Sequence, residues 1–212
     1  MTTPNLVDRI LSLSSKEKLG HPDVTYLLSL ISAWSYSDDA TLLKILRRDS
    51  LAGKQRALHI EHHSVQNSAF PVDVNAVLVS IGEGEVETPL QVLAFRGTEV
   101  TNFIDLLTDA LVEPHPWPRG GADEWVHRGF FLSLDVLWPE LSEELSRKQG
   151  YLVFTGHSLG GALAVLAGRR SCDDELQGPE LGGVYTFGQP MVGGEAFVRA
   201  WPDLPLHRFV FH

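Results

Sequence analysis

The sequence predicts an α/β fold, with a mainly parallel central sheet and helices on both faces. From about residue 72 onward, short apolar runs that suit buried strands alternate with longer segments of helical period. At residues 151–168 an apolar run (Tyr-Leu-Val-Phe-Thr) leads through a turn of small residues into an Ala-rich helical segment. The chain has 212 residues, 43% of them hydrophobic. We therefore expect a single domain, residues 1–212, with a substantial core.

Residues 1–70 are expected to form an N-terminal helical region. Helical segments are predicted over residues 6–13, 23–36 and 38–48. Asp23, which follows a proline, is the expected cap of the second segment. The third segment carries four apolar residues between positions 42 and 46 at helical spacing, so one of its faces should be buried.

Strand patterns begin at residue 72. Residues 74–81 alternate in polarity, and the Gly-Glu-Gly-Glu run at 82–85 indicates a hairpin turn. Residues 90–95 form the continuous apolar run that is typical of a buried central strand. The later predicted elements are an irregular proline-rich stretch at 113–118, a helix over about 125–147 with Pro139 as a candidate break, the 151–168 unit, an acidic loop at 172–180, and strands over 184–187 and 206–211.

Charge and composition exclude some partners. The net charge of −10 disfavours nucleic acids and anionic membranes as partners held by bulk electrostatics, but it is compatible with a lipid substrate approached through an apolar patch. No apolar run reaches the roughly 18 residues of a transmembrane helix. The N-terminus lacks the pattern of a signal peptide, so we expect a cytoplasmic protein, with leaderless export left open. A single cysteine, Cys172, precludes an internal disulfide.

Ser158 is the strongest candidate for a catalytic group. It stands at the centre of Gly-His-Ser-Leu-Gly-Gly (156–161), between a predicted strand and a predicted helix. This is the context of a nucleophile elbow, in which the serine occupies a strained turn and small neighbours avoid a steric collision. The turn would place the hydroxyl at a helix N-terminus, where free N–H groups favour a developing oxyanion. The alternative is a glycine-rich turn with an exposed, non-catalytic serine.

Four separated motifs resemble one known family. They are Ala-Phe-Arg-Gly-Thr (94–98), Val-His-Arg-Gly-Phe (126–130), the 156–161 run, and Tyr-Thr-Phe-Gly-Gln-Pro-Met-Val-Gly (185–193). Their order and spacing resemble the class 3 (fungal-type) lipases of the α/β-hydrolase superfamily. The recognisable lipase core is placed at residues 72–212. Met191 stands where the family usually has Arg.

The resemblance implies roles for individual residues. Ser158 would be the nucleophile of a lipase or esterase that hydrolyses carboxylic esters of lipids, acylglycerols above all, through an acyl-enzyme. Thr98 and Leu159 would supply the N–H groups of the oxyanion hole. Arg96 is expected to hold the oxyanion loop through a carboxylate or the backbone. A phospholipase-type effector is a close alternative.

The two histidines in the motifs have a structural interpretation. His127 and His157 are expected to be packed side chains rather than acid–base residues. The resemblance implies no metal and no organic cofactor. The oligomeric state is not readable from the sequence.

The segment that follows Thr98 is where class 3 lipases place a mobile lid. Here residues 99–118 offer an apolar face on a short predicted helix, formed chiefly by Val100, Phe103, Leu106 and Leu107. Such a face could cover the site in water and open in transient contact with a membrane or lipid interface. The alternative is a buried helix that packs on the core.

A serine nucleophile needs a base and an acid that orients the base. The family pattern places both beyond His212, so we expect an incomplete lipase domain. Within the chain, Glu195 and His212 are weak substitutes and Asp203 is a poor one. A catalytically inactive lipase-like protein that binds a lipid or a protein partner is the alternative function. The last strand should leave apolar surface around Phe209 exposed and favour association.

Overall fold

The computed structural model describes residues 6–13, 15–18, 20–46, 58–66, 73–82, 86–96, 113–203 and 205–210. In chain order the elements are α1 (Leu6–Ser12), α2 (Ser15–Lys18), α3 (Pro22–Trp34), α4 (Asp39–Ile45), β1 (Leu58–Gln66), β2 (Asp73–Ile81), β3 (Leu90–Phe95), β4 (Pro114–Pro116), β5 (Trp125–His127), α6 (Arg128–Ser146), β6 (Tyr151–His157), α7 (Leu159–Asp173), β7 (Glu180–Phe187), α8 (Glu195–Arg199) and β8 (Leu206–Phe209).

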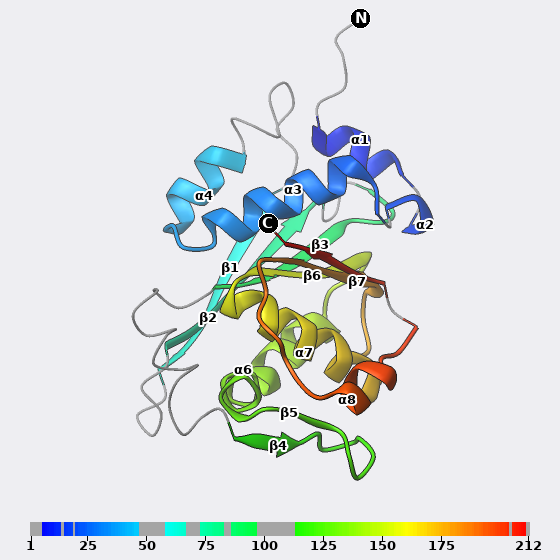
Figure 1. Ribbon diagram of the computed structural model, residues 1–212. Helices are drawn as coiled ribbons and strands as arrows, with labels where there is room; N and C mark the ends of the chain where they lie inside the picture. The colour runs from blue at the N-terminus through cyan, green and yellow to red at the C-terminus, as the bar shows by residue number, and fades with distance from the viewer. Residues whose placement is uncertain are drawn as a thin grey trace, which may run out of the picture.

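A six-stranded sheet organises the molecule, in the order β1-β2-β3-β6-β7-β8. The strands from β3 to β8 pair in parallel, whereas β1, β2 and β3 pair antiparallel. The N-terminal helices lie over one face, and α6 and α7 lie over the other (Figure 1). The predicted α/β architecture, mainly parallel and covered on both faces, is confirmed.

The central strand β6 contributes to two hydrophobic cores. Leu152 and Phe154 pack with residues of α6 and α7. Tyr151 and Val153, which alternate with them, pack with residues of α1, α3 and α4. Because both faces of the strand are covered, its sequence is a continuous apolar run rather than an alternating one.

Two expectations for the N-terminal half are wrong. Strands begin with β1 at Leu58, inside the region that was predicted to be helical. The polar residues of β1 hide its strand pattern in the sequence. One of them, Glu61, accepts from Lys148, which lies two residues after the end of α6, at 2.8 Å. The cap of α3 is His21, whose Nδ1 accepts from the Asp23 N–H at 3.2 Å. The Asp23 carboxylate pairs with Arg9 instead.

The middle of the chain also departs from the prediction. Residues 125–127 form β5, which pairs with β4 in a small hairpin, so the helix begins only at Arg128. Pro139 does not break α6, because it lies on the exposed side, where water can bond the carbonyl that the proline leaves without a partner. The short helix α8 was not predicted. Within the described ranges, no helix is long and apolar enough to cross a membrane.

Candidate active site

Ser158 lies at the junction of β6 and α7 in a backbone conformation that few residues adopt. Its φ of 55° and ψ of −122° fall outside the regions ordinarily open to a side chain-bearing residue. The Ser158 N–H donates to the Phe187 carbonyl at 2.9 Å, and its own carbonyl accepts from Gly161 at 3.0 Å and Ala162 at 3.3 Å. The neighbouring strand and the helix therefore hold the strained turn from both sides.

Glycines on both sides of Ser158 make this conformation possible. A Cβ at Gly156 would lie 2.3 Å from the carbonyl of Gly160, and a Cβ at Gly160 would lie 2.1 Å from the Phe95 carbonyl oxygen. Both distances are far below van der Waals contact, which confirms the predicted need for glycine. The start of α7 thus presses directly against the end of β3.

The Ser158 side chain stands at the N-terminus of α7. The first N–H groups of a helix, here those of Leu159 and Gly160, have no acceptor within the helix. Together with the positive end of the helix dipole, they can stabilise an anion that forms next to the serine. Thr98, the other predicted oxyanion residue, lies outside the described residues, as do the predicted lid residues 100–111.

The end of β3 approaches this turn through Arg96. Its N–H donates to the Asn75 carbonyl at 2.9 Å. Its guanidinium carbon lies 5.4 Å from the centre of the Tyr36 ring, which is a cation–π contact. The oxyanion loop that this side chain is predicted to hold lies outside the described residues, so its pairing with a carboxylate or the backbone stays a prediction.

None of the weak candidates for acid or base is positioned beside Ser158 in the described structure. Glu195 is exposed at the start of α8 and pairs with Arg199. Asp203 is exposed ahead of β8, and His212 lies outside the described residues. Among the residues that the structure describes, no imidazole or carboxylate forms a hydrogen bond with the serine hydroxyl.

The two motif histidines differ from each other. His127 is 8% exposed, and its ring stacks on Phe130 with centroids 4.2 Å apart. Neither of its ring nitrogens has a hydrogen-bond partner within the described part of the chain, and burial lowers its pKa. It is therefore a packed neutral ring, as predicted. His157 is exposed at the end of β6, so its predicted packed position is wrong.

Comparison with known proteins defines the family. Residues 92–211, more than half of the chain, match the family model described as Lipase (class 3). The chain belongs to the class 3 lipase family. The resemblance of the four motifs is thereby confirmed, and lipid ester hydrolysis is the activity that the family supports.

The matched relatives are considerably longer than this chain. It is 34% identical to Lipase ZK262.3 of Caenorhabditis elegans over 120 residues, and this match covers 55% of this chain and 33% of that protein. It is 36% identical over 112 residues to a lipase of Rhizopus niveus, and the match covers 50% of this chain and 28% of that one. The triacylglycerol lipase OBL1 of Arabidopsis thaliana is 35% identical over 92 residues, 41% of this chain and 17% of that protein. The chain thus spans about a third or less of these relatives.

Solved class 3 lipase structures share the fold. Lipase II from Rhizopus niveus superposes with a TM-score of 0.64 at 21% identity, covering 93% of this chain and 72% of that one. A fungal lipase–inhibitor complex, described as a model for interfacial activation, gives a TM-score of 0.63 at 24% identity with the same coverage. These similarities confirm the α/β-hydrolase fold.

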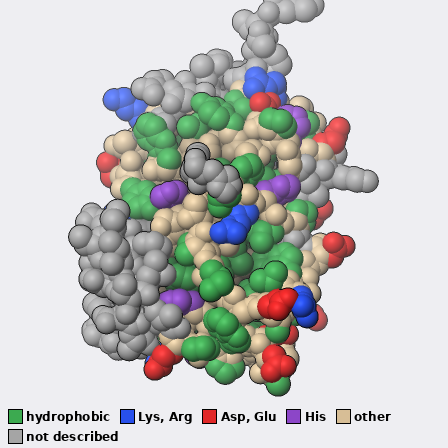
Figure 2. Space-filling view, viewed as in Figure 1, with side chains coloured by type: hydrophobic (Ala, Val, Ile, Leu, Met, Phe, Trp, Pro, Cys, Tyr) green, Lys and Arg blue, Asp and Glu red, His purple; other side chains and the backbone are tan. Residues whose placement is uncertain are grey.

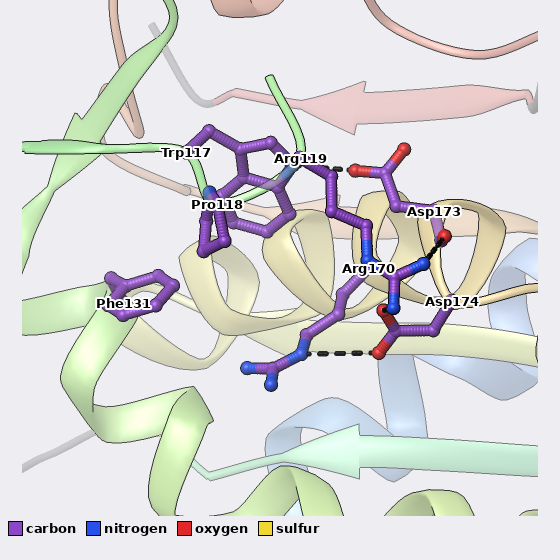
Figure 3. Close-up of a pocket in the computed structure, with 7 residues that line it drawn as sticks. All are labelled: Trp117, Pro118, Arg119, Phe131, Arg170, Asp173 and Asp174. Carbon is purple, nitrogen blue, oxygen red and sulfur yellow. Dashed lines mark hydrogen bonds and ion pairs between the residues drawn. The ribbon is translucent and has the colours of Figure 1, made fainter.

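A first cavity, of about 180 Å³, is too far from Ser158 to belong to this site. It lies at the C-terminal end of α7 between Trp117, Phe131 and the charged residues Arg119, Arg170 and Asp174 (Figure 3). Ser158 is at the opposite end of the same 15-residue helix, roughly 20 Å away at 1.5 Å per residue.

The charged groups of this cavity neutralise one another. Arg119 pairs with Asp174 at 2.9 Å, and Arg170 pairs with Asp135 at 2.7 Å. The Trp117 indole N–H donates to Asp173 at 2.6 Å. The cluster therefore ties α7 to α6 and to the loop after β4. Within the described residues, no group of three or more His, Cys, Asp or Glu side chains could hold a metal ion.

A second cavity, of about 430 Å³, begins next to the elbow. Gln189, at its edge, is the neighbour that a Cβ on Gly161 would meet at 2.9 Å. The other residues that line this cavity are mostly apolar and come from α7, α8, β8 and the segments before and after α8: Val165, Pro190, Met191, Val192, Gly193, Phe197, Val198, Trp201, Leu206 and Arg208. This groove extends along the outer edge of the sheet.

Proposed function

We propose that this chain forms the nucleophile-bearing part of a lipase that hydrolyses carboxylic esters of lipids, in particular acylglycerols, through Ser158. The observation that supports this best is the strained backbone of Ser158 between two glycines that cannot carry a Cβ. Such strain is retained where it aims a reactive group. The acylglycerol substrate is supported by the relative named as a triacylglycerol lipase.

In the proposed reaction, the Ser158 Oγ attacks the carbonyl carbon of the ester, and its proton passes to a base. The carbonyl oxygen becomes an oxyanion that accepts hydrogen bonds from the N–H of Leu159 and, in this proposal, of Thr98. The C–O bond to the alcohol then breaks, and the base returns the proton to the leaving alcohol. Water next attacks the acyl-enzyme in the same way and releases the fatty acid.

The base and its orienting acid are to be sought outside the described residues. Within those residues, no histidine contacts the serine hydroxyl. The pattern of the class 3 family, with an acid and then a histidine after the last strand, supports the same assignment. Without these groups the alcohol of Ser158 would remain a weak nucleophile.

We also propose that the part of residues 99–118 that precedes β4 acts as a lid whose apolar side chains contact a lipid interface. The end of this segment cannot belong to a lid, because Pro114–Pro116 pair with β5 and Trp117 is buried in the core. The support is the sequence itself, because Val100, Phe103, Leu106 and Leu107 recur at helical spacing. A related structure, the fungal lipase–inhibitor complex, is described as a model for interfacial activation. The lid proposal predicts that the rate of hydrolysis of a short-chain triacylglycerol rises steeply when the substrate concentration exceeds its solubility.

A fluorophosphonate probe tests the function directly. The probe phosphonylates an activated serine, so a protein that holds this chain together with the base and the acid should be labelled at Ser158, and Ser158→Ala in the same protein should not be labelled. Ser133→Ala is a matched control, because Ser133 is buried and bonds only within its own helix. Labelling of this protein and of the control, together with release of fatty acid from a triacylglycerol, supports the proposal. A folded protein that holds the base and the acid and binds lipid vesicles, but shows neither labelling nor hydrolysis, overturns it.

A further inference from the structure

The strand that carries Ser158 is tied to the N-terminal region by a buried hydrogen bond. The Oγ of Ser32, in the last turn of α3, lies 2.8 Å from the Oγ1 of Thr155 on β6. Thr155 in turn donates to the Tyr185 carbonyl of β7 at 2.8 Å. A threonine hydroxyl has one proton, so Ser32 must be the donor to Thr155. The result is a directed chain of hydrogen bonds across a helix and two central strands.

This link lies in a fully buried and otherwise apolar layer. Ser32 and Tyr185 are 1% exposed, and Thr155 is fully buried. On β6, Thr155 continues the row of Tyr151 and Val153, which pack against the N-terminal helices. A buried hydroxyl without a partner is strongly unfavourable, so the Ser32 hydroxyl depends on Thr155 as its acceptor. The bond therefore fixes where β6 sits beneath α3.

Thr155 is also close to the strained turn. It precedes Ser158 by only three residues, and the strand ends between them at His157. A lateral shift of Thr155 would be transmitted to a turn that Gly156 and Gly160 already hold without free space.

The turn that follows α3 contacts a second part of the site. Tyr36, two residues after the end of α3, packs its ring against the guanidinium of Arg96 at 5.4 Å. Arg96 directly follows β3, whose last carbonyl, that of Phe95, would lie 2.1 Å from a Cβ on Gly160 at the start of α7. The C-terminal part of α3 and the turn after it therefore contact β6 and the residue that follows β3.

We propose that Ser32 is a positioning residue for Ser158: its hydrogen bond to Thr155 sets the placement of the serine turn relative to the end of β3. This inference rests on the proposed function for its consequence in catalysis, but its structural part does not. It assigns to α3, which precedes the segment matched by the family model (92–211), a role in the active site.

A double-variant cycle separates positioning from simple stability. Ser32→Ala removes the donor to Thr155, whose hydroxyl keeps its bond to the Tyr185 carbonyl, whereas Thr155→Val leaves the buried Ser32 hydroxyl without its acceptor. Thr155→Val should therefore lower the midpoint of thermal unfolding more than Ser32→Ala does. Removing both hydroxyls leaves neither unpaired, so the double variant should regain part of the loss seen in Thr155→Val. The directed bond is still absent in it. We therefore expect its Ser158 to react about tenfold more slowly with the fluorophosphonate, as a small misplacement of a reacting group produces.

The amide NMR signals of Ser158 and Leu159 give a readout that needs no activity. They should shift in Ser32→Ala and in the double variant. They should not shift in Ser35→Ala, whose hydroxyl bonds only to a carbonyl of its own helix at 3.0 Å. Unshifted signals in the double variant, or a labelling rate that recovers together with the stability, would overturn the inference. Absence of labelling in a protein that holds this chain together with the base and the acid contradicts the proposed function instead, and the amide signals still decide the role of Ser32.

Discussion

At the scale of single residues, Gly160 is the position in the serine turn where a side chain would collide most closely with the neighbouring backbone. A methyl group there would lie 2.1 Å from the Phe95 carbonyl oxygen, and both groups belong to backbone that cannot yield locally. We predict that Gly160→Ala lowers the free energy of unfolding by about 2–3 kcal/mol, in the range of an overpacked core. Gly121→Ala is the control, because its nearest atom, a Glu124 carboxylate oxygen, is 3.6 Å away. Equal denaturant midpoints for the two variants would contradict this prediction.

His127 gives stability a dependence on pH. Burial lowers its pKa in the folded state below the ordinary value of 6.5. As the pH falls below about 6.5, the unfolded chain binds the proton first, so the free energy of unfolding declines. We predict a shallower decline between pH 7 and 5 in His127→Phe, which keeps a ring against Phe130. Urea unfolding at several pH values measures this.

The control for that experiment is the parent chain, unfolded at the same pH values. If the free energy of unfolding of His127→Phe declines as steeply with falling pH as that of the parent chain, the His127 ring takes up its proton alike in the folded and unfolded states.

At the scale of elements, Arg169 joins α7 to the β4–β5 hairpin and to α8. Its side chain is 7% exposed and pairs with Glu124 at 3.1 Å and with Asp173 at 3.0 Å. It also donates to the Ala200 carbonyl at 2.9 Å. We predict that Arg169→Met lowers the free energy of unfolding by about 3 kcal/mol, because two largely buried carboxylates lose their counter-charge.

A matched test uses the exposed pair on α8. The side chain of Arg199 is 75% exposed and pairs with Glu195, so Arg199→Met should change stability by less than about 0.5 kcal/mol. Chemical denaturation of both variants compares them directly. A loss for Arg169→Met no larger than for Arg199→Met would mean that the network does not hold these elements together.

Elements with local signals were predictable, and elements that depend on distant partners were not. The β6–turn–α7 unit is encoded within about 20 contiguous residues, by an apolar run, two obligatory glycines and an alanine-rich helix. Strand β1 was missed because it is rich in polar residues whose partners are distant in sequence, as in the 2.7 Å contact of His63 with Glu140 of α6. Helix α8 has only five residues, too few for a helical period to show.

The candidate site divides in the same way. Motif spacing predicted Ser158 and the glycines around it. It did not point to Ser32, because a serine in a helix ordinarily faces solvent, and only the fold places it 2.8 Å from Thr155. A threonine in the apolar row of a buried strand was the available signal, since such a hydroxyl requires a partner.

At the scale of the whole molecule, the outer edge of the sheet determines how the chain behaves in solution. β8 is the edge strand of the six-stranded sheet, with Leu206 38% and Val210 45% exposed. Met191 and Val198, 76% and 64% exposed, lie beside it along the 430 Å³ groove. Hydrophobic side chains are spread over this face of the molecule, and acidic ones lie mainly around its rim (Figure 2). An unprotected edge next to apolar surface is a template for pairing with another chain.

We therefore predict concentration-dependent association of the 212-residue chain, and its reduction when Leu206 and Val210 are both replaced by Lys, because a charged edge strand resists pairing. Sedimentation equilibrium should give a mass that rises above 23.4 kDa with concentration for the parent chain and stays near it for the double variant. Tyr26→Lys, at an apolar position on α3 that is 54% exposed, should associate like the parent. A parent chain that remains at 23.4 kDa at every concentration would show that this edge does not drive pairing, despite its exposed apolar residues.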